Sequence, residues 1–153
     1  MKENEPPSTL ETHLGYWLRM VSNAVSHSFA RKVEREGVAV SEWVFLRALY
    51  DAERVQPSHL AEGMGMTKGA ISKLSDRLFE KSLIERHANP DDRRAHTLAL
   101  NAAGRELVPR LAALADRNDA EFFDALTPDE RQRLAKLLRK IVEKRELAGA
   151  PVD

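Results

Sequence analysis

The fold is decided by residues 56–105, which read QPSHLAEGMGMTKGAISKLSDRLFEKSLIERHANPDDRRAHTLALNAAGR. Pro57 suits the first position of a short helix, and the glycines on either side of Met64 predict a tight turn after it. Thr67 can cap a second helix, because a threonine side chain accepts a bond from the free amides of a helix start. Apolar residues recur on one face of that helix: Ile71, Leu74 and Leu78. This half of the stretch therefore predicts two helices joined by a turn.

Two short strand candidates follow the helix pair. The first covers residues 83–88 and the second covers residues 96–100. Between them, residues 89–95 read Asn-Pro-Asp-Asp-Arg-Arg-Ala, a polar and charged turn. Two strands around a charged loop, directly behind a helix pair, indicate a helix-turn-helix with a β-hairpin wing.

Longer amphipathic helices are predicted on both sides of this unit. Apolar residues recur at three- and four-residue steps over residues 10–33, the pattern of a helix of about six turns. Ser41 stands where an N-cap belongs ahead of a second, more buried helix. Asn101 can cap a long helix, in which Pro109 predicts a bend or a looser start. Residues 127–130 read Thr-Pro-Asp-Glu, a capping box with proline at the first position of the last helix.

These elements predict a mainly α fold with a small β-hairpin wing. The length of 153 residues suits one domain. We expect that domain to span residues 9–147. It would follow a disordered leader, residues 1–8, and precede a tail, residues 148–153, that frays.

The flanking helical regions carry more apolar surface than one small lobe can cover. They span about residues 10–35 and 102–147. Pairing with a second copy of the chain would bury both apolar seams, so we expect dimerisation helices and a homodimer. An intramolecular helical bundle is the alternative.

The composition narrows the class of protein. The 24 Lys and Arg balance the 24 Asp and Glu, and a net charge of zero argues against a nucleic-acid binder. Residues 53–105 nevertheless hold nine basic against seven acidic residues, a local excess that permits DNA binding. The chain has no cysteine, which excludes disulfides and thiolate metal sites. No stretch approaches the roughly 18 apolar residues of a membrane helix, and no signal-peptide core is present, so we expect a cytoplasmic protein without a membrane partner.

The sequence contains no motif for catalysis or metal binding. It has no nucleophile motif and no glycine-rich phosphate loop. Its histidines lack the paired spacing of a metal site: His13, His27, His59, His87 and His96. We therefore expect neither an enzyme nor a metal or cofactor.

The helix pair, the hairpin and the following helix start together resemble the MarR (multiple-antibiotic-resistance regulator) family. The matching residues are Leu60, Ala61, Gly65, Thr67, the wing signature Asp92-Arg93-Arg94, and the helix start Leu100-Asn101-Ala102-Ala103-Gly104-Arg105. Asn101 replaces the threonine usual in that helix start, but asparagine is also a good cap. Gln56 stands where a serine or threonine cap commonly precedes the first helix of the motif.

The resemblance covers nearly the whole chain and implies a sequence-specific regulator of transcription that binds double-stranded DNA. The implied fold is a winged helix-turn-helix with a DNA-binding lobe at about residues 41–100 and intertwined terminal helices. It also implies a palindromic operator, repression as the commoner outcome, and a small-molecule effector that releases the DNA. A winged helix used for protein–protein contact, without DNA binding, is the alternative.

Candidate DNA-reading residues lie on the second helix of the pair. With Ile71 at the centre of the buried face, 100° per residue turns Gly69, Lys73 and Arg77 outward, along with Asp76. Glu80 faces the same way as Asp76, and we expect these two acids to pair with Lys73, Arg77 or a neighbouring basic residue. The first turns of such a helix approach the bases in the major groove, and its free amides suit a phosphate. The predicted DNA contacts are Thr67, Lys68, Gly69, Ser72, Lys73 and Arg77.

The wing supplies the second set of candidates. By the family match, Arg94 enters the minor groove, where a narrow groove concentrates negative potential. Arg93 lies beside it, and Asp92 holds the loop in shape through a charge-assisted bond. A solvated Asp-Asp-Arg-Arg turn is the alternative for the wing, and a solvated helix face is the alternative for the helix residues, which the wing behind the helix disfavours.

An effector pocket of the family type would lie beside the first two helices. The candidates there are His13, Trp17, Trp43 and Arg47. Arg47 would be the cation for an aromatic acid. Ordinary core or surface roles are the alternative for each of them.

Overall fold

Six α-helices, a short 3-10 helix and one two-stranded sheet make up the part of the chain that the computed structural model describes, residues 5–89 and 91–152. The side chains of Arg93 and Arg94 lie outside that description. The elements are η1 (Leu10–Thr12), α1 (Leu14–Glu34), α2 (Val40–Tyr50), α3 (Pro57–Met64), α4 (Lys68–Glu80), β1 (Ile84–Asn89), β2 (Asp92–Leu100), α5 (Ala102–Phe123) and α6 (Pro128–Lys144). This is the mainly helical fold with a hairpin that the sequence predicts.

The winged lobe is built around α2. Its Phe45, Leu46 and Leu49 are fully buried and form one cluster with residues of α3, α4, the hairpin and α5. The predicted buried face of α4 is confirmed, because Ile71, Leu74 and Leu78 all lie in this core. At about 1.5–3 kcal/mol for each buried large apolar side chain, this cluster is the main favourable term holding α4 in place.

The hairpin is longer than predicted. β1 pairs with β2 in antiparallel register from Ile84 opposite Leu100 to Asn89 opposite Asp92. The expected turn over residues 89–95 was therefore too long, and residues 92–95 belong to β2. Backbone pairing in an exposed hairpin does not need an apolar alternation, so the sequence pattern could not reveal this extension.

Helix starts follow local capping chemistry, with one correction. The side chains of Thr67, Asn101 and Thr127 each accept a bond from the backbone amide three residues on, as predicted. Ser41 is not the cap of α2. Ala39 occupies that position, and its amide donates to the carboxylate of Glu42 at 2.9 Å.

Two expectations about the long helices were wrong. The apolar stretch 10–33 is not one helix, because the chain leaves helical geometry at His13, between η1 and α1. α5 runs through Pro109 as one element, and Pro109 is exposed. No described helix is both long and apolar enough to cross a membrane.

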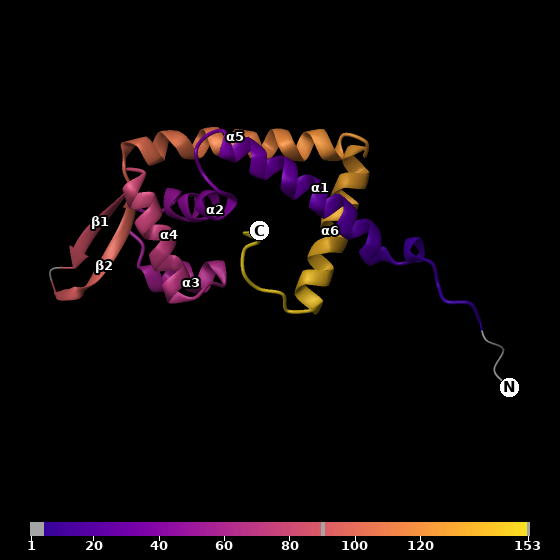
Figure 1. Ribbon diagram of the computed structural model, residues 1–153, viewed down its shortest axis with the longest axis horizontal. Helices are drawn as coiled ribbons and strands as arrows, with labels where there is room; N and C mark the ends of the chain where they lie inside the picture. The colour runs from indigo at the N-terminus through magenta and orange to yellow at the C-terminus, as the bar shows by residue number, and fades with distance from the viewer. Residues whose placement is uncertain (1–4, 90, 153) are drawn as a thin grey trace.

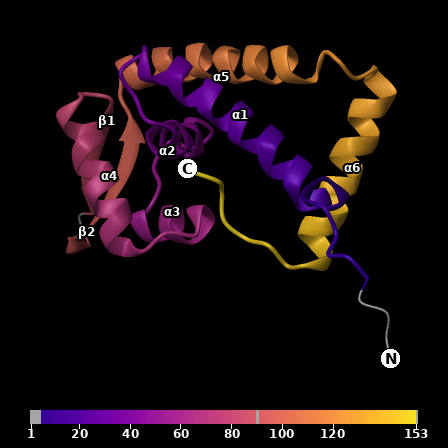
Figure 2. The same ribbon diagram turned by 45° about the vertical axis from the view of Figure 1, so that its right-hand side comes forward.

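The long helix α5 separates two ends of the molecule. The winged lobe lies at one end and α6 at the other, and the chain then returns towards α2 and α3 (Figures 1 and 2). Described residues of the tail that the sequence predicts to fray pack on the lobe instead. Gly149 lies against Gly65, and Val152 packs against the core of the lobe. Both glycines have positive φ, +64° at Gly65 and +89° at Gly149, a conformation that residues with a side chain rarely adopt.

Candidate nucleic-acid interface

The recognition helix α4 presents a polar face to solvent. Lys68, Ser72 and Lys73 are exposed on it, opposite the buried apolar residues. Thr67 caps its start and accepts from the amide of Ala70 at 3.1 Å. A side chain added at Gly69 would meet only the Thr67 hydroxyl, at 4.0 Å, so the helix start is open to a close approach. Free amides, two lysines and two hydroxyls at one helix start suit a phosphate backbone and base edges.

A groove runs between α4 and the hairpin. Its volume is about 560 Å³, and it includes the predicted contact residues Lys68 and Ser72. The start of α3 and the strand residue His96 complete its lining. The structure therefore brings the helix and the hairpin to one face. Sequence reasoning had not assigned His96 to this face, because its place depends on the strand register.

An ion pair fixes the hairpin against α4. Arg86 of β1 donates to the carboxylate of Asp76 and lies over the ring of Phe79, 4.7 Å from its centroid. Arg86 thus neutralises Asp76, as expected of a neighbouring basic residue. This pairing removes one negative charge from the face turned to solvent and sets the wing beside the helix.

A buried carboxylate lies on the other side of α4. Glu42 of α2 is 1% exposed, and its Oε1 accepts from Arg77 at 3.1 Å and from Lys81 at 3.0 Å. Burial by itself would raise the pKa of Glu42. The hydrogen bonds from Lys81 and from the Ala39 amide, with the two nearby positive charges, outweigh burial and hold that pKa below its ordinary 4.5. Glu42 is therefore an anion at neutral pH.

This site changes the interpretation of Arg77. The helical period predicts that Arg77 points outward into solvent. In the structure, Arg77 forms an ion pair with Glu42, and 51% of its side chain is exposed. Glu42 was missed because nothing near it in the sequence marks a buried acid. The nearest available signal is its place three residues after Ala39, the third position of a helix, where glutamate often bonds back to the start.

At the hairpin tip, Asp92 is exposed and begins β2 opposite Asn89. The side chain of Asn89 accepts from the amide of Asp91 at 3.0 Å, which shapes the turn. The predicted roles of Arg93 and Arg94 fall on side chains outside the described part of the structure and stay predictions.

The four effector candidates do not share one described cavity. His13 and Trp17 are exposed at the start of α1, where the Trp17 indole donates to the Glu11 carbonyl at 2.8 Å. Trp43 packs edge-to-face on Phe29. Arg47 pairs with Asp51 at 2.8 Å and points to solvent.

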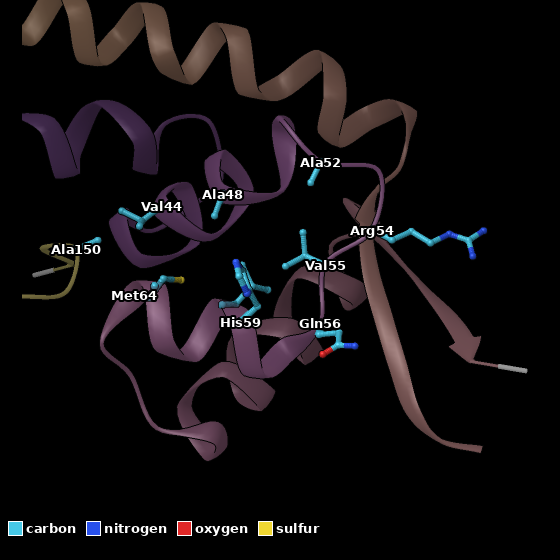
Figure 3. Close-up of a pocket in the computed structure, with 11 residues that line it drawn as sticks. Val44, Ala48, Ala52, Arg54, Val55, Gln56, His59, Met64 and Ala150 are labelled. Atoms are coloured by element: carbon cyan, nitrogen blue, oxygen red, sulfur yellow. The ribbon is translucent and has the colours of Figure 1, made fainter. Parts of the chain in front are cut away.

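A different cavity lies between α2 and α3. Its volume is about 570 Å³, and Figure 3 shows the residues around it. The apolar lining consists of Val44, Ala48, Ala52, Val55, Leu60 and Met64, with Ala150 of the tail at one side. His59 and Gln56 add polar atoms, whereas Arg54 extends away towards the hairpin (Figure 3). An apolar cavity with a few polar groups is typical of a small-molecule site.

Comparison with known proteins identifies the family. The model of the MarR family matches residues 39–96. A candidate transcriptional regulatory protein for the hcr operon of Thauera aromatica is 31% identical over 129 residues, which cover 84% of this chain and 78% of that protein. The chain belongs to the MarR family. The transcriptional regulator HosA of Escherichia coli O111:H- is 25% identical over 66% of the chain and 75% of HosA.

Solved structures in the same family share the fold. A variant of Escherichia coli MarR bound to operator DNA is 25% identical, with a TM-score of 0.75 over 84% of this chain and 93% of that one. Bordetella bronchiseptica BpsR, whose DNA binding is regulated by 6-hydroxynicotinic acid, is 24% identical, with a TM-score of 0.76 over 89% of this chain and 97% of that one. The MarR-family chain described here is therefore a DNA-binding winged-helix regulator of transcription and not an enzyme.

Proposed function

We propose that this MarR-family protein acts as a homodimer on a palindromic operator, and that it is a cytoplasmic repressor released by a small molecule. The observation that carries the proposal is an apolar surface that the described part of the chain leaves largely uncovered. It consists of Leu10, Leu14, Trp17, Leu18, Met20, Val21, Leu137, Leu138, Ile141, Val142 and Leu147, all more than a third exposed.

The exposed apolar residues belong to the two ends of the chain that flank the winged lobe. Most lie on α1 and α6, and α6 makes no extended contact with another described helix or strand. An intramolecular bundle would have covered these side chains, so the alternative raised by the sequence is disfavoured. A second copy would cover them, and a two-fold axis would present the same face of each chain to the other.

A two-fold dimer also explains how the DNA would be read. It would set two copies of α4 about 34 Å apart, one turn of the duplex, so that each enters a major groove. Lys73 would donate to a guanine edge, Lys68 and Ser72 would bond bases or phosphates, and Arg94 would enter the flanking minor groove. Repression would follow wherever the occupied site overlaps a promoter.

The cavity between α2 and α3 is the proposed effector site. It lies against α3, the helix that precedes α4 in the motif, so a ligand there can alter how α4 is held. Its apolar lining with His59 at one side suits a small aromatic acid, the chemistry of the 6-hydroxynicotinic acid that regulates BpsR. His13, Trp17, Trp43 and Arg47 lie outside it.

One experiment tests the DNA-binding proposal. Selection of bound sequences from a random duplex pool should return a palindrome with half-sites about one turn apart. Lys73→Ala should relax the preference at one position in each half-site, while Lys136→Ala, on α6, should not. Arg94→Ala should weaken binding to many sequences and flatten its salt dependence. Failure to enrich any sequence at low ionic strength would refute the proposal and favour the protein–protein alternative.

A further inference from the structure

We propose that Glu42 is a positioning residue for DNA recognition, and that its buried carboxylate holds Arg77 and Lys81 where their exposed cations contact a DNA phosphate. The inference rests on the docking of α4 proposed above. It assigns a role in DNA binding to an acid of α2 that lies away from the DNA-facing surface.

The contacts around Glu42 join three segments of the chain. Its carboxylate accepts from the Ala39 amide at the start of α2, at 2.9 Å, from Arg77 of α4, and from Lys81, which caps the C-terminal end of α4. Lys81 also donates to the carbonyl of Gly37, in the turn after α1, at 2.8 Å. One buried anion therefore ties the recognition helix to the connection between α1 and α2.

The two cations need such a partner to lie together. Arg77 lies in the last turn of α4 and Lys81 is the residue that caps its C-terminal end, four residues on, so the two cations lie on one side of the helix and repel each other. Glu42 offsets that repulsion while leaving 51% of the Arg77 side chain and 38% of the Lys81 side chain exposed. Each side chain is thus held on one side and partly exposed to solvent on the other, an arrangement that suits a phosphate contact.

Stability alone does not explain this arrangement. Taking a carboxylate out of water is costly, and its attraction to paired cations often does no more than offset that cost. A well-packed apolar side chain at position 42 would stabilise the fold at least as much as the buried carboxylate does. What the acid adds is a single geometry for α4, which the Asp76–Arg86 pair fixes from the opposite side.

The test compares two variants that remove the same charge. Glu42→Gln frees Arg77 and Lys81, whereas Glu80→Gln removes an exposed carboxylate from the end of the same helix. Each is titrated as the full-length protein against the selected operator and a random duplex by fluorescence anisotropy, with the active fraction measured by stoichiometric titration. The ratio of the two affinities separates positioning from general electrostatics, because loss of a negative charge alone strengthens both complexes.

Glu42→Gln should lower the ratio of operator to random-duplex affinity by about tenfold, because the phosphate contacts of Arg77 and Lys81 fix the register of α4 and only the operator complex depends on that register. Glu80→Gln should leave that ratio unchanged. In an Arg77→Gln background, Glu42→Gln should lower the ratio less than it does in the wild type, because only Lys81 is then left to be positioned.

Equal ratios for Glu42→Gln and Glu80→Gln would overturn the proposal, as would full additivity with Arg77→Gln. If Glu42→Gln fails to fold, Glu42→Asp withdraws the carboxylate by one methylene and should give an intermediate ratio. A wild-type ratio in Glu42→Asp would equally contradict the proposal. A wild-type protein that binds no duplex would instead refute the proposed function.

Discussion

Gly104 is the position where a single methyl group should be felt most strongly. It is buried in the first turn of α5, directly behind the hairpin. A Cβ built there would lie under 3.0 Å from the carbonyl oxygen of Leu83 and 3.1 Å from Cδ2 of Leu100. The Leu83 oxygen belongs to the backbone, so a change of side-chain rotamer cannot relieve the contact. It also accepts from the amide of Asn101 at 3.2 Å, so moving it would break that hydrogen bond.

The magnitude follows from two opposing effects. Overpacking against backbone costs about 3 kcal/mol, the upper part of the range for small-to-large core changes. Alanine in place of glycine in a helix stabilises the protein by about 1 kcal/mol, because alanine has the higher helix propensity. Gly104→Ala should therefore destabilise the protein by about 2 kcal/mol, which lowers Tm by roughly 4–8 °C in a chain of this size.

Thermal unfolding followed by circular dichroism at one fixed protein concentration measures the effect. Gly63→Ala is the matched control, because Gly63 is exposed in α3 and a Cβ there meets nothing within 4 Å. It should raise stability by about 0.5–1 kcal/mol. The described packing of α5 on the hairpin would be contradicted if Gly104→Ala were as stable as the wild type. It would also be contradicted if Gly63→Ala lost more stability than Gly104→Ala.

Three further predictions concern the dimer, the cavity and Glu42. Ile141→Asp should raise the dissociation constant of the dimer by about three orders of magnitude, because one large apolar side chain in each copy loses its burial, at about 2 kcal/mol each. Lys140→Asp should leave that constant unchanged. Analytical ultracentrifugation measures both variants, and an Ile141→Asp protein that is still dimeric would contradict the apolar interface. Ala48→Trp should fill the cavity between α2 and α3, so that a small aromatic acid that releases the wild type from the operator should no longer release the variant in an anisotropy titration; retained release would exclude that cavity. The depressed pKa of Glu42 means that its contribution to stability is present above pH 4.5 and lost as the pH falls through the lower pKa of the folded state. The stability difference between wild type and Glu42→Gln in urea should therefore be larger at pH 6 than below that pKa, and a difference independent of pH would refute it.

Part of the interface was readable from the sequence because it depends on local geometry. The caps at Thr67 and Asn101 involve atoms three residues apart, and the exposure of Ser72 and Lys73 follows from the helical period around Ile71. Interactions of this range are fixed by neighbouring residues. The sequence could therefore predict the helix pair, the hairpin and the outward face of α4.

The sequence by itself determined the elements, their order and the family, since periodicity, caps and motif spacing are properties of adjacent residues. Only the tertiary structure decided how the cations of α4 are held. Glu42 and Arg77 meet across 35 residues of chain, and Arg86 meets Asp76 across the turn between α4 and β1. The contact between Gly149 of the tail and Gly65 is likewise a contact between residues far apart in the sequence. Contacts of this kind depend on how whole elements pack, and no local pattern of residues encodes them.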